Sequence, residues 1–591
     1  MNTSLHLLII QNNTPMRKLF TTLFLLLFTS ISFAQETKKD TLKTEEITVV
    51  KPYSPTISEA FKIKENPTID TQSFQKEQVN YSIFSVPVAS TFTPSKGKAQ
   101  GLKRAPKERL FDNYVSAGFG NYTTPSVQAF LHAGNPRYND FGLFLNYHSS
   151  EGGINDVLLD DNFSNIKAAI YYKQFERDFN WKVTGDYNRQ QINYYGLPTD
   201  ITFTENVLSN MDEEQVYNNI SAGGSIIFDD AIFQSASIEV SNFFDSYNSN
   251  ELQLLVKPSF EFPISTEIIK TDVLVAYLNG KFDQDYTASN EIKYSFLNLG
   301  VNPNFEVLRD DLSINLGVKL YYTFNLENSS NAFKAYPNVT ASYKVVDDVF
   351  ILLAGVTGDL IQNSYEDFTQ ANPFVSPTLN VQQTDQQYKA FIGAKGKLAS
   401  NIGYNVNVNY VSEKDKALFV QNPTKTNGSI LVSNAYEAGN SFQVVYDNVN
   451  TINFLGEINI EVSKEFQVGA GFHYANYSTT DALEAWNLPD FTATISGEYK
   501  TEKWYVGTKI FFRGATKDYV ITYGDALTDG TVVKNDAYID LNFNGGYIFT
   551  NRLSVYGKIN NAIGDNYNRF TNYPVQSIQF LAGVTYKFDI N

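Results

Sequence analysis

The chain has 591 residues, a net charge of −17, 15% aromatic residues and no cysteine. The lack of cysteine excludes disulfides, thiolate nucleophiles, cysteine-based metal centres and lipidation of an N-terminal cysteine. The acidic balance argues against a nucleic-acid partner, because phosphate backbones are bound by Lys and Arg.

A secretory signal peptide is the first element that the sequence predicts. A short basic region precedes the apolar run 19–28, and residues 32–34 (Ser-Phe-Ala) have the small-x-small pattern of a cleavage site. We therefore expect a signal peptide over residues 1–34, with Met16 as the true start and Gln35 as the mature N-terminus. No later apolar run approaches the roughly 20 residues that a membrane helix needs, so the mature chain is expected to cross the inner membrane completely.

Residues 35–110 are predicted to form a mostly extended segment. Residues 35–109 hold 13 Lys/Arg and 9 Asp/Glu, a net charge of +4; with the two basic residues of the leader, this leaves −23 for the rest of the chain. An acidic and β-branched stretch near its start consists of Glu45, Glu46, Ile47, Thr48, Val49 and Val50. A basic run near its end consists of Lys96, Lys98, Lys103, Arg104, Lys107 and Arg109. Two interpretations of the run stay open: a solvated linker, or a segment that lies inside or beneath an acidic barrel lumen and blocks it.

From about residue 112 onward, apolar and polar residues alternate with a period of two, which indicates β-strands with two different faces. In residues 401–410, one face carries Ile402, Tyr404, Val406, Val408 and Tyr410, and the other carries Gly403, Asn405, Asn407 and Asn409. A soluble β-sandwich would alternate as well. The segments have 12 to 20 residues, however, which exceeds the usual globular strand and suits a tilted membrane strand.

Ten very short polar turns separate these segments, and longer irregular loops lie between the turns. The turns are residues 135–137, 176–178, 229–230, 263–265, 309–311, 347–348, 400–401, 463–465, 501–503 and 551–552; the most evident loops are 151–164, 191–213, 362–385, 422–439 and 515–534. Short turns at one end and long loops at the other are typical of a bacterial outer-membrane barrel with its turns in the periplasm. With both ends of the barrel also periplasmic, ten turns predict eleven hairpins and therefore 22 antiparallel strands over residues 111–591. Indistinct boundaries near residues 119–124 and 417–420 leave 20 or 24 strands open.

The last predicted strand has a continuous apolar face made of Ile578, Phe580, Ala582, Val584, Tyr586 and Phe588. Gly583, Tyr586 and Phe588 resemble the terminal signal that barrel-assembly machineries recognise. Two features depart from that signal: Leu581 stands where a polar residue is usual, and three residues follow Phe588. Trp181 and Trp504 each follow a predicted periplasmic turn, where an aromatic girdle is expected.

Residues 558–567, then Tyr573-Pro574 and the last strand, resemble the end of TonB-dependent receptors of the Bacteroidota type. Residues 446–449 running into 455–458 are similar to an internal strand of the same family. The resemblance implies a 22-stranded barrel with a plugged lumen. It also implies that residues 45–50 form a TonB box, which would pair with TonB by strand addition. Residues 51–110 are too short for the family's plug domain and contain none of its Gly- and Arg-rich motifs.

No constellation of residues indicates catalysis or metal binding. The four histidines (His6, His132, His148 and His473) are not at metal-ligand spacing from one another. Acidic stretches at Asp156, Asp160 and Asp161, and at residues 212–214, could bind Ca²⁺, but neither follows a calcium loop, so solvated acidic loops are the favoured interpretation. We expect neither enzymatic activity nor a cofactor.

Two functions remain from the sequence. The first is transport across the outer membrane by a barrel that resembles a TonB-dependent receptor. The second is an accessory or scaffold barrel in an envelope complex for secretion or outer-membrane protein assembly. The expected partners are outer-membrane lipid and lipopolysaccharide, the barrel-assembly machinery during biogenesis, and either TonB or other envelope proteins.

Overall fold

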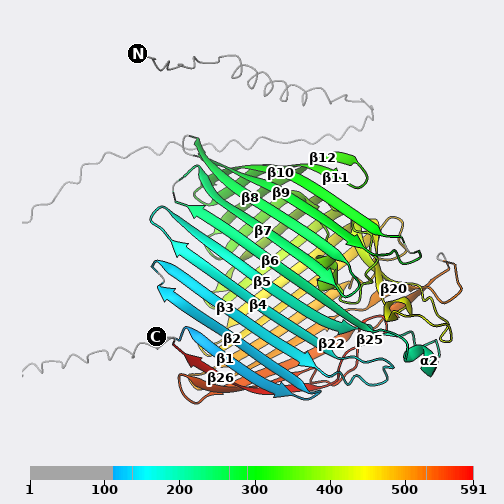
Figure 1. The fold of residues 1–591 in the computed structure, drawn as a ribbon. Coiled ribbons are helices and arrows are strands. Elements are labelled where there is room, and N and C mark those ends of the chain that lie inside the picture. Colours follow the sequence, from blue (N-terminus) through cyan, green and yellow to red (C-terminus); the bar gives the residue numbers. More distant parts are fainter. Residues whose placement is uncertain are drawn as a thin grey trace, which may run out of the picture. The chain divides into compact units, whose positions relative to one another are not determined.

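The barrel is a single closed sheet of 22 antiparallel strands (Figure 1). The computed structural model describes residues 111–589 except 136, 230, 265–266, 289 and 527–528. Each barrel strand pairs with its neighbour along the chain, and the first strand, β1, pairs with the last, β26, from Asn113 opposite Phe588 to Gly120 opposite Leu581. The predicted fold class and strand number are therefore confirmed.

The barrel strands in chain order are β1 (Asn113–Gly120), β2 (Thr124–Asn135), β3 (Asn139–Ser150), β4 (Phe163–Phe175), β5 (Phe179–Asn193), β6 (Glu214–Phe228), β7 (Phe233–Asp245), β8 (Asn250–Ile264), β9 (Glu267–Phe282), β10 (Ile292–Arg309), β11 (Leu312–Asn325), β12 (Ser330–Val346), β13 (Phe350–Ile361), β14 (Thr384–Ala399), β15 (Ile402–Gln421), β16 (Phe442–Glu461), β17 (Phe466–Thr479), β18 (Phe491–Lys500), β19 (Trp504–Arg513), β22 (Tyr538–Ile548), β23 (Leu553–Asn560) and β26 (Gln579–Phe588). Small elements lie in the loops: α2 (Glu205–Leu208), α3 (Tyr365–Ala371), η1 (Ala435–Glu437), the hairpin β20–β21 (Thr516–Val520 and Thr531–Asn535) and the hairpin β24–β25 (Asn568–Phe570 and Tyr573–Pro574).

All ten predicted short turns join consecutive strands, from β2–β3 through β22–β23. The long loops gather at the opposite end of the barrel, on the right of Figure 1. The two indistinct boundaries are also resolved. Residues 121–123 form a tight turn with Tyr122 and Thr123 at positive φ, whereas β15 continues through residues 417–420 with only a bulge before them.

The outer face of the barrel is apolar because successive side chains point to opposite sides of each strand. Val406, Val408 and Tyr410 of β15 are exposed on this face, as the alternating pattern predicts. Aromatic side chains lie near the short turns: the ring of Trp504 is 5.0 Å from that of Tyr499, centroid to centroid. So much exposed apolar surface requires a lipid environment, and the strands have the length to cross it. The molecule is thus an outer-membrane barrel.

The terminal strand closes the sheet as the sequence predicts. Phe580, Val584 and Tyr586 are exposed on the lipid face, and the rings of Tyr586 and Phe588 stack 6.1 Å apart. Gly583 lies on the other face, beneath Tyr556. A Cβ atom at this glycine would lie 2.4 Å from the Tyr556 phenol and 2.6 Å from the Ala117 carbonyl oxygen, so the position admits no side chain.

Several predictions concern residues outside the described part of the chain. These are the signal peptide, the acidic and β-branched stretch 45–50, the basic run 96–109 and the extended form of residues 35–110. Among the described residues, no helix has the length and apolar character to cross a membrane.

Candidate functional site: loops folded into the barrel lumen

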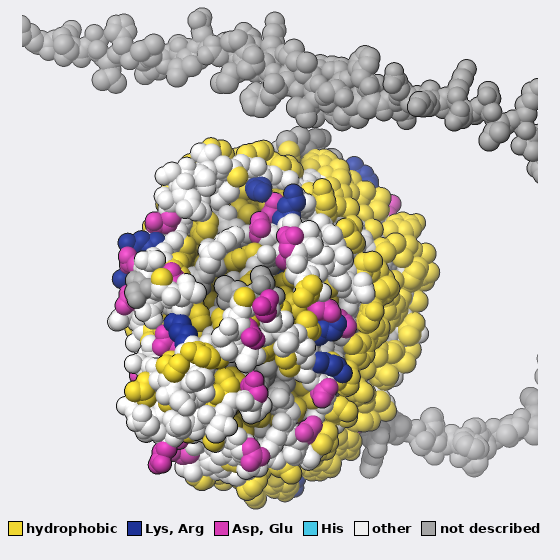
Figure 2. Space-filling model, turned by 90° about the vertical axis from the view of Figure 1, so that its right-hand side faces the viewer, with side chains coloured by type: hydrophobic (Ala, Val, Ile, Leu, Met, Phe, Trp, Pro, Cys, Tyr) yellow, Lys and Arg dark blue, Asp and Glu magenta, His cyan; other side chains and the backbone are white. Residues whose placement is uncertain are grey.

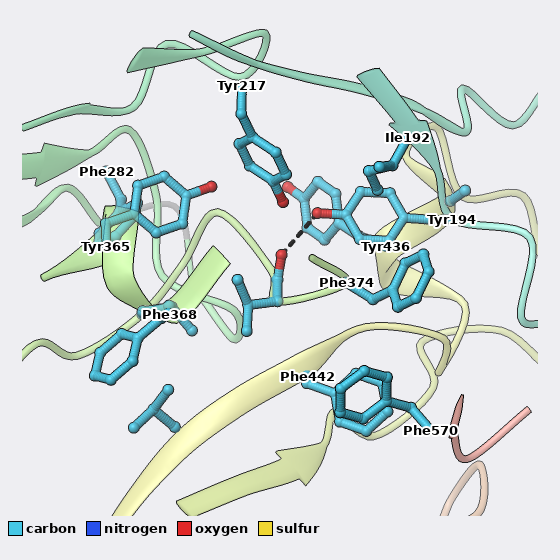
Figure 3. Packing of buried hydrophobic residues seen from close by; sticks show 14 of the residues in the cluster. Ile192, Tyr194, Tyr217, Phe282, Tyr365, Phe368, Phe374, Tyr436, Phe442 and Phe570 are labelled. Carbon is cyan, nitrogen blue, oxygen red and sulfur yellow. Dashed lines mark hydrogen bonds between the residues drawn. The ribbon is translucent and has the colours of Figure 1, made fainter. Parts of the chain in front are cut away.

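Four long loops fold inward at the long-loop end of the barrel and pack on one another. They are the β5–β6 loop (residues 194–213), the β13–β14 loop (362–383), the β15–β16 loop (422–441) and the β23–β26 loop (561–578), together called the cap. Their apolar side chains form one buried cluster with Leu159 of the β3–β4 loop and residues at the ends of β5, β6, β7, β9, β10 and β16 (Figure 3). The cluster lies where loops of an open pore would be hydrated, so the cap is a packed structure.

Aromatic rings and buried polar contacts hold the cap together. The ring of Tyr573 in the β23–β26 loop stacks on Phe374 of the β13–β14 loop, with centroids 3.6 Å apart. The Tyr194 hydroxyl donates a hydrogen bond of 2.7 Å to the Val375 carbonyl oxygen, the dashed line in Figure 3. Such stacking and satisfied buried hydroxyls are worth more than the buried area alone. Opening of the lumen is therefore expected to require that these loops separate from one another.

The short helix α3 in the β13–β14 loop docks on the inner wall through Glu251 of β8. The Glu251 carboxylate is fully buried and accepts hydrogen bonds from the backbone N–H of Tyr365 at 2.7 Å and the Tyr294 hydroxyl at 2.7 Å. Ser364 caps the same helix end by accepting from the Asp367 N–H at 3.0 Å. The carboxylate thus binds N–H groups that lack partners inside a helix.

Asp245, the last residue of β7, holds the side chain of the same tyrosine. The Tyr365 hydroxyl donates to the Asp245 carboxylate at 2.8 Å, and the Gln215 amide donates to it at 3.2 Å. Only 8% of Asp245 is exposed. Within the described part of the chain, neither Asp245 nor Glu251 has a Lys or Arg partner, so hydrogen bonds to the loop stabilise both carboxylates. Tyr365, Asp245 and Glu251 are called the latch.

The base of the β13–β14 loop is fixed as well. The Gln383 amide donates to the Gln362 side-chain oxygen at 2.7 Å and to Asn298 of β10 at 2.8 Å. At the ends of the flanking strands, Asp359 accepts from Lys319 at 2.6 Å and Asp385 accepts from Lys334 at 2.7 Å. The β13–β14 loop is therefore attached to the wall along its length, and the other cap loops pack on it.

Space remains between α3 and the barrel wall. A cavity of about 730 Å³ is lined by strand residues of β2 to β7, β23 and β26 on one side and by Glu366, Thr369 and Gln370 of α3 on the other. Burial and the neighbouring Glu251 carboxylate raise the pKa of Glu366 to about 7. The lining is mostly amide and charged, which suits a polar solute.

The long-loop end is strongly acidic. The connections at this end (residues 121–123, 151–162, 194–213, 246–249, 283–291, 326–329, 362–383, 422–441, 480–490, 514–537 and 561–578) hold 23 Asp/Glu and 4 Lys/Arg, a net charge of −19. Figure 2 shows this end, with acidic side chains spread over it and hydrophobic side chains on the flank. Most of the acidic excess of the barrel therefore lies in the loops.

The predicted acidic loop residues do not form a metal site. Asp161 accepts backbone hydrogen bonds from Gly153 and Ile154, both at 2.9 Å, and so folds the β3–β4 loop. Within the described residues, no group of three or more His, Asp or Glu side chains could hold a metal. His132 pairs with Asp140 at 2.6 Å, and His473 contacts Asn453 at 2.8 Å, both apart from any metal geometry.

Sequence reasoning missed the latch. Asp245 and Glu251 flank a four-residue hairpin turn, and Tyr365 lies in a loop more than 110 residues away. The alternating pattern of β7 and β8 was one available signal. It places the carboxylates of Asp245 and Glu251 on the lumenal face beside aromatic residues, which is unusual for acidic side chains. The Ser-Tyr-Glu-Asp sequence at residues 364–367 is a recognisable N-terminal helix signal inside the predicted loop.

Comparison with solved structures shows what this barrel is similar to. The FrpB iron transporter from Neisseria meningitidis is 8% identical and superposes with a TM-score of 0.61 over 81% of this chain and 82% of that chain. A variant of the ferric enterobactin receptor PfeA from Pseudomonas aeruginosa is 11% identical, with a TM-score of 0.59 over 80% of each chain. The ferric-catecholate import receptor Fiu from E. coli is 10% identical, with a TM-score of 0.57 over 82% of each chain.

No protein-family model matches the chain, and no curated protein matches it. The identities to the solved structures show a shared fold. The resemblance to TonB-dependent receptors is therefore confirmed for the 22-stranded barrel.

Proposed function

We propose that this protein is a gated transporter of the outer membrane, in which the cap is the gate. The observation that carries the proposal is the latch: the β13–β14 loop enters a receptor-sized barrel and is held on its wall by two buried carboxylates. A scaffold barrel needs a stable shape but no closure built from hydrogen bonds in its lumen. The proposal includes no enzymatic step.

The proposed transport has two parts. The cap loops separate from one another and from the wall, which exposes a lumen lined by amide, hydroxyl and charged side chains. A polar solute then passes along the side of the lumen that α3 does not fill, where the cavity of about 730 Å³ lies. Residues 45–50 would offer TonB the strand that energises this opening, as the resemblance implies. Neighbours described as an iron transporter and as an import receptor support transport over the accessory alternative.

Planar bilayers containing the purified full chain test the proposal. We expect low conductance for the wild type, because the cap closes the lumen, and a strong increase for the double variant Tyr365→Phe/Glu251→Gln. The matched control is Tyr388→Phe, which alters an exposed tyrosine on β14 away from the latch. Equal conductance in the wild type and the double variant, with folding intact, would refute a latched gate.

A further inference from the structure

The cavity between α3 and the wall has two faces that carry opposite charge. Lys167 of β4 and Lys558 of β23 line the wall, and Glu366 of α3 lines the opposite face. Arg189 of β5 also lines the wall, and its guanidinium donates to the Ser164 hydroxyl at 3.2 Å. Within the described residues, neither lysine has a carboxylate partner. Both stand out in a barrel with 23 more acidic than basic residues.

The wall presents its groups in rows fixed by strand register. One row crosses four neighbouring strands in the order Asn146 (β3), Lys167 (β4), Asn188 (β5) and Asn219 (β6). All four side chains line the cavity. The lysines supply charge, and the carboxamides can both donate and accept hydrogen bonds. The row can therefore bind a ligand that carries a carboxylate next to amide or hydroxyl groups.

The helix face holds its carboxylate in place. One oxygen of Glu366 accepts from the Asn219 amide and from the Gln370 amide, the latter at 3.3 Å. The backbone N–H of Glu366 donates to Glu251 at 3.3 Å, so the latch fixes the residue that bears this charge. The second carboxylate oxygen has no protein partner among the described residues and can accept from a ligand.

We infer that this cavity binds a zwitterionic solute of amino-acid or short-peptide size. The ligand carboxylate faces the wall that carries Lys167 and Lys558, and the ligand ammonium group faces Glu366. The volume of about 730 Å³ lies within the range of small-ligand sites. Tyr217 and Phe243 supply apolar surface beside the amide row. The inference rests on the proposed function and adds the class of solute.

Four probes of nearly equal size test the assignment: triglycine (zwitterion), N-acetyl-triglycine (anion), triglycinamide (cation) and N-acetyl-triglycinamide (neutral). Binding to the purified full chain in detergent is measured by isothermal titration calorimetry at pH 7.5. This pH lies above the pKa of Glu366, about 7, and just below that of a free α-amino group. We expect the zwitterion to bind about tenfold more tightly than the anion or the cation, because each of these two probes lacks one of the two charge contacts.

The variants assign each charge preference to a face. Glu366→Gln should lower zwitterion affinity to that of the anion, and Lys167→Gln/Lys558→Gln should lower it to that of the cation. The matched controls are Lys509→Gln, on β19 and outside the cavity lining, and Glu205→Gln on α2. Folding is checked by far-ultraviolet circular dichroism.

Equal binding of all four probes, no binding of any, or an unchanged preference in the variants would overturn the inference. The gated-transport proposal would survive that result if the Tyr365→Phe/Glu251→Gln variant has a higher conductance than the wild type. The two proposals can therefore fail separately.

Discussion

The Tyr365 hydroxyl donates a hydrogen bond of 2.8 Å to the carboxylate of Asp245, which joins the inward-folded β13–β14 loop to the end of β7. Both side chains are buried, at 0% and 8% exposure. The backbone of the same tyrosine binds Glu251, so one residue uses two buried carboxylates of adjacent strands. A loop bound in this way occupies the lumen as part of the fold, and its release requires that both carboxylates find other partners.

Tyr365→Phe should loosen the cap without removing the aromatic ring from the core. It deletes the phenolic donor and leaves the buried Asp245 carboxylate with fewer partners, which costs about 1–3 kcal/mol. The fraction of time that the lumen is open should therefore increase by a factor between about five and about a hundred. The measurement is the time-averaged conductance per channel in planar bilayers. A conductance equal to that of the wild type would show that this hydrogen bond does not keep the lumen closed.

Glu251→Ala should release the first turn of α3. The substitution removes the acceptor for two backbone N–H groups and for the Tyr294 hydroxyl, whereas Glu251→Gln keeps one acceptor oxygen. Hydrogen–deuterium exchange of residues 364–371 is therefore expected to be fastest in Glu251→Ala, intermediate in Glu251→Gln and slowest in the wild type. Glu205→Ala, at an exposed position on α2, is the control. Identical protection in all four proteins would contradict the assigned role of Glu251.

Docking of α3 should weaken as pH rises through the range 4.5 to 7. The ordinary pKa of a Glu carboxyl is near 4.5, and in the docked helix burial and the Glu251 charge raise that of Glu366 to about 7. Between these values the docked state binds more protons than the released state, so the contribution of Glu366 favours docking at low pH and is lost as pH rises through 7. Exchange rates of residues 364–371, corrected for intrinsic chemistry, should increase several-fold more from pH 5 to pH 8 in the wild type than in Glu366→Gln. A pH dependence that the substitution leaves unchanged would assign the effect to other groups.

Gly583→Ala should impair closure of the barrel. Its Cβ would lie 2.4 Å from the Tyr556 side chain and 2.6 Å from the Ala117 carbonyl oxygen, a backbone atom that cannot swing aside. Gly557→Ala on the neighbouring strand is the matched control, since its nearest atom is 4.0 Å away. Gly583→Ala/Tyr556→Ala should recover only part of the folded fraction, because the backbone clash remains. The measurement is the folded fraction after refolding into detergent, and equal fractions for the two single variants would contradict the argument.

The parts of the fold that follow from local chemistry could be predicted. Alternation in β15 and the polar turns at residues 309–311 and 400–401 depend only on neighbours in the chain, so they led directly to the strand number. The resemblance of the last strands to receptors agreed with that count. Bulges such as that between Glu413 and Lys416 do not change the number of strands.

The cap could not be predicted because its contacts are long-range. Tyr573 stacks on Phe374, and Tyr194 donates to Val375, across about 180 to 200 residues of chain. A loop that is hydrated and a loop that packs in a lumen have similar compositions, and only the partners distinguish them. The charge distribution shows the same difficulty: net charge suggested an acidic lumen, whereas 23 of the Asp/Glu residues lie in the long-loop connections.

The most direct test of closure by the cap joins two of its loops reversibly. Ser376 of the β13–β14 loop and Asn422 of the β15–β16 loop are buried in contact, with the Asn422 amide donating to the Ser376 hydroxyl at 3.0 Å. Since the chain has no native cysteine, Ser376→Cys and Asn422→Cys in the Tyr365→Phe background provide the only thiols. Bridging them with a short bis-thiosulfonate should reduce single-channel conductance to the wild-type level, and dithiothreitol should restore it. Conductance that stays high with the bridge in place would contradict the cap as the gate.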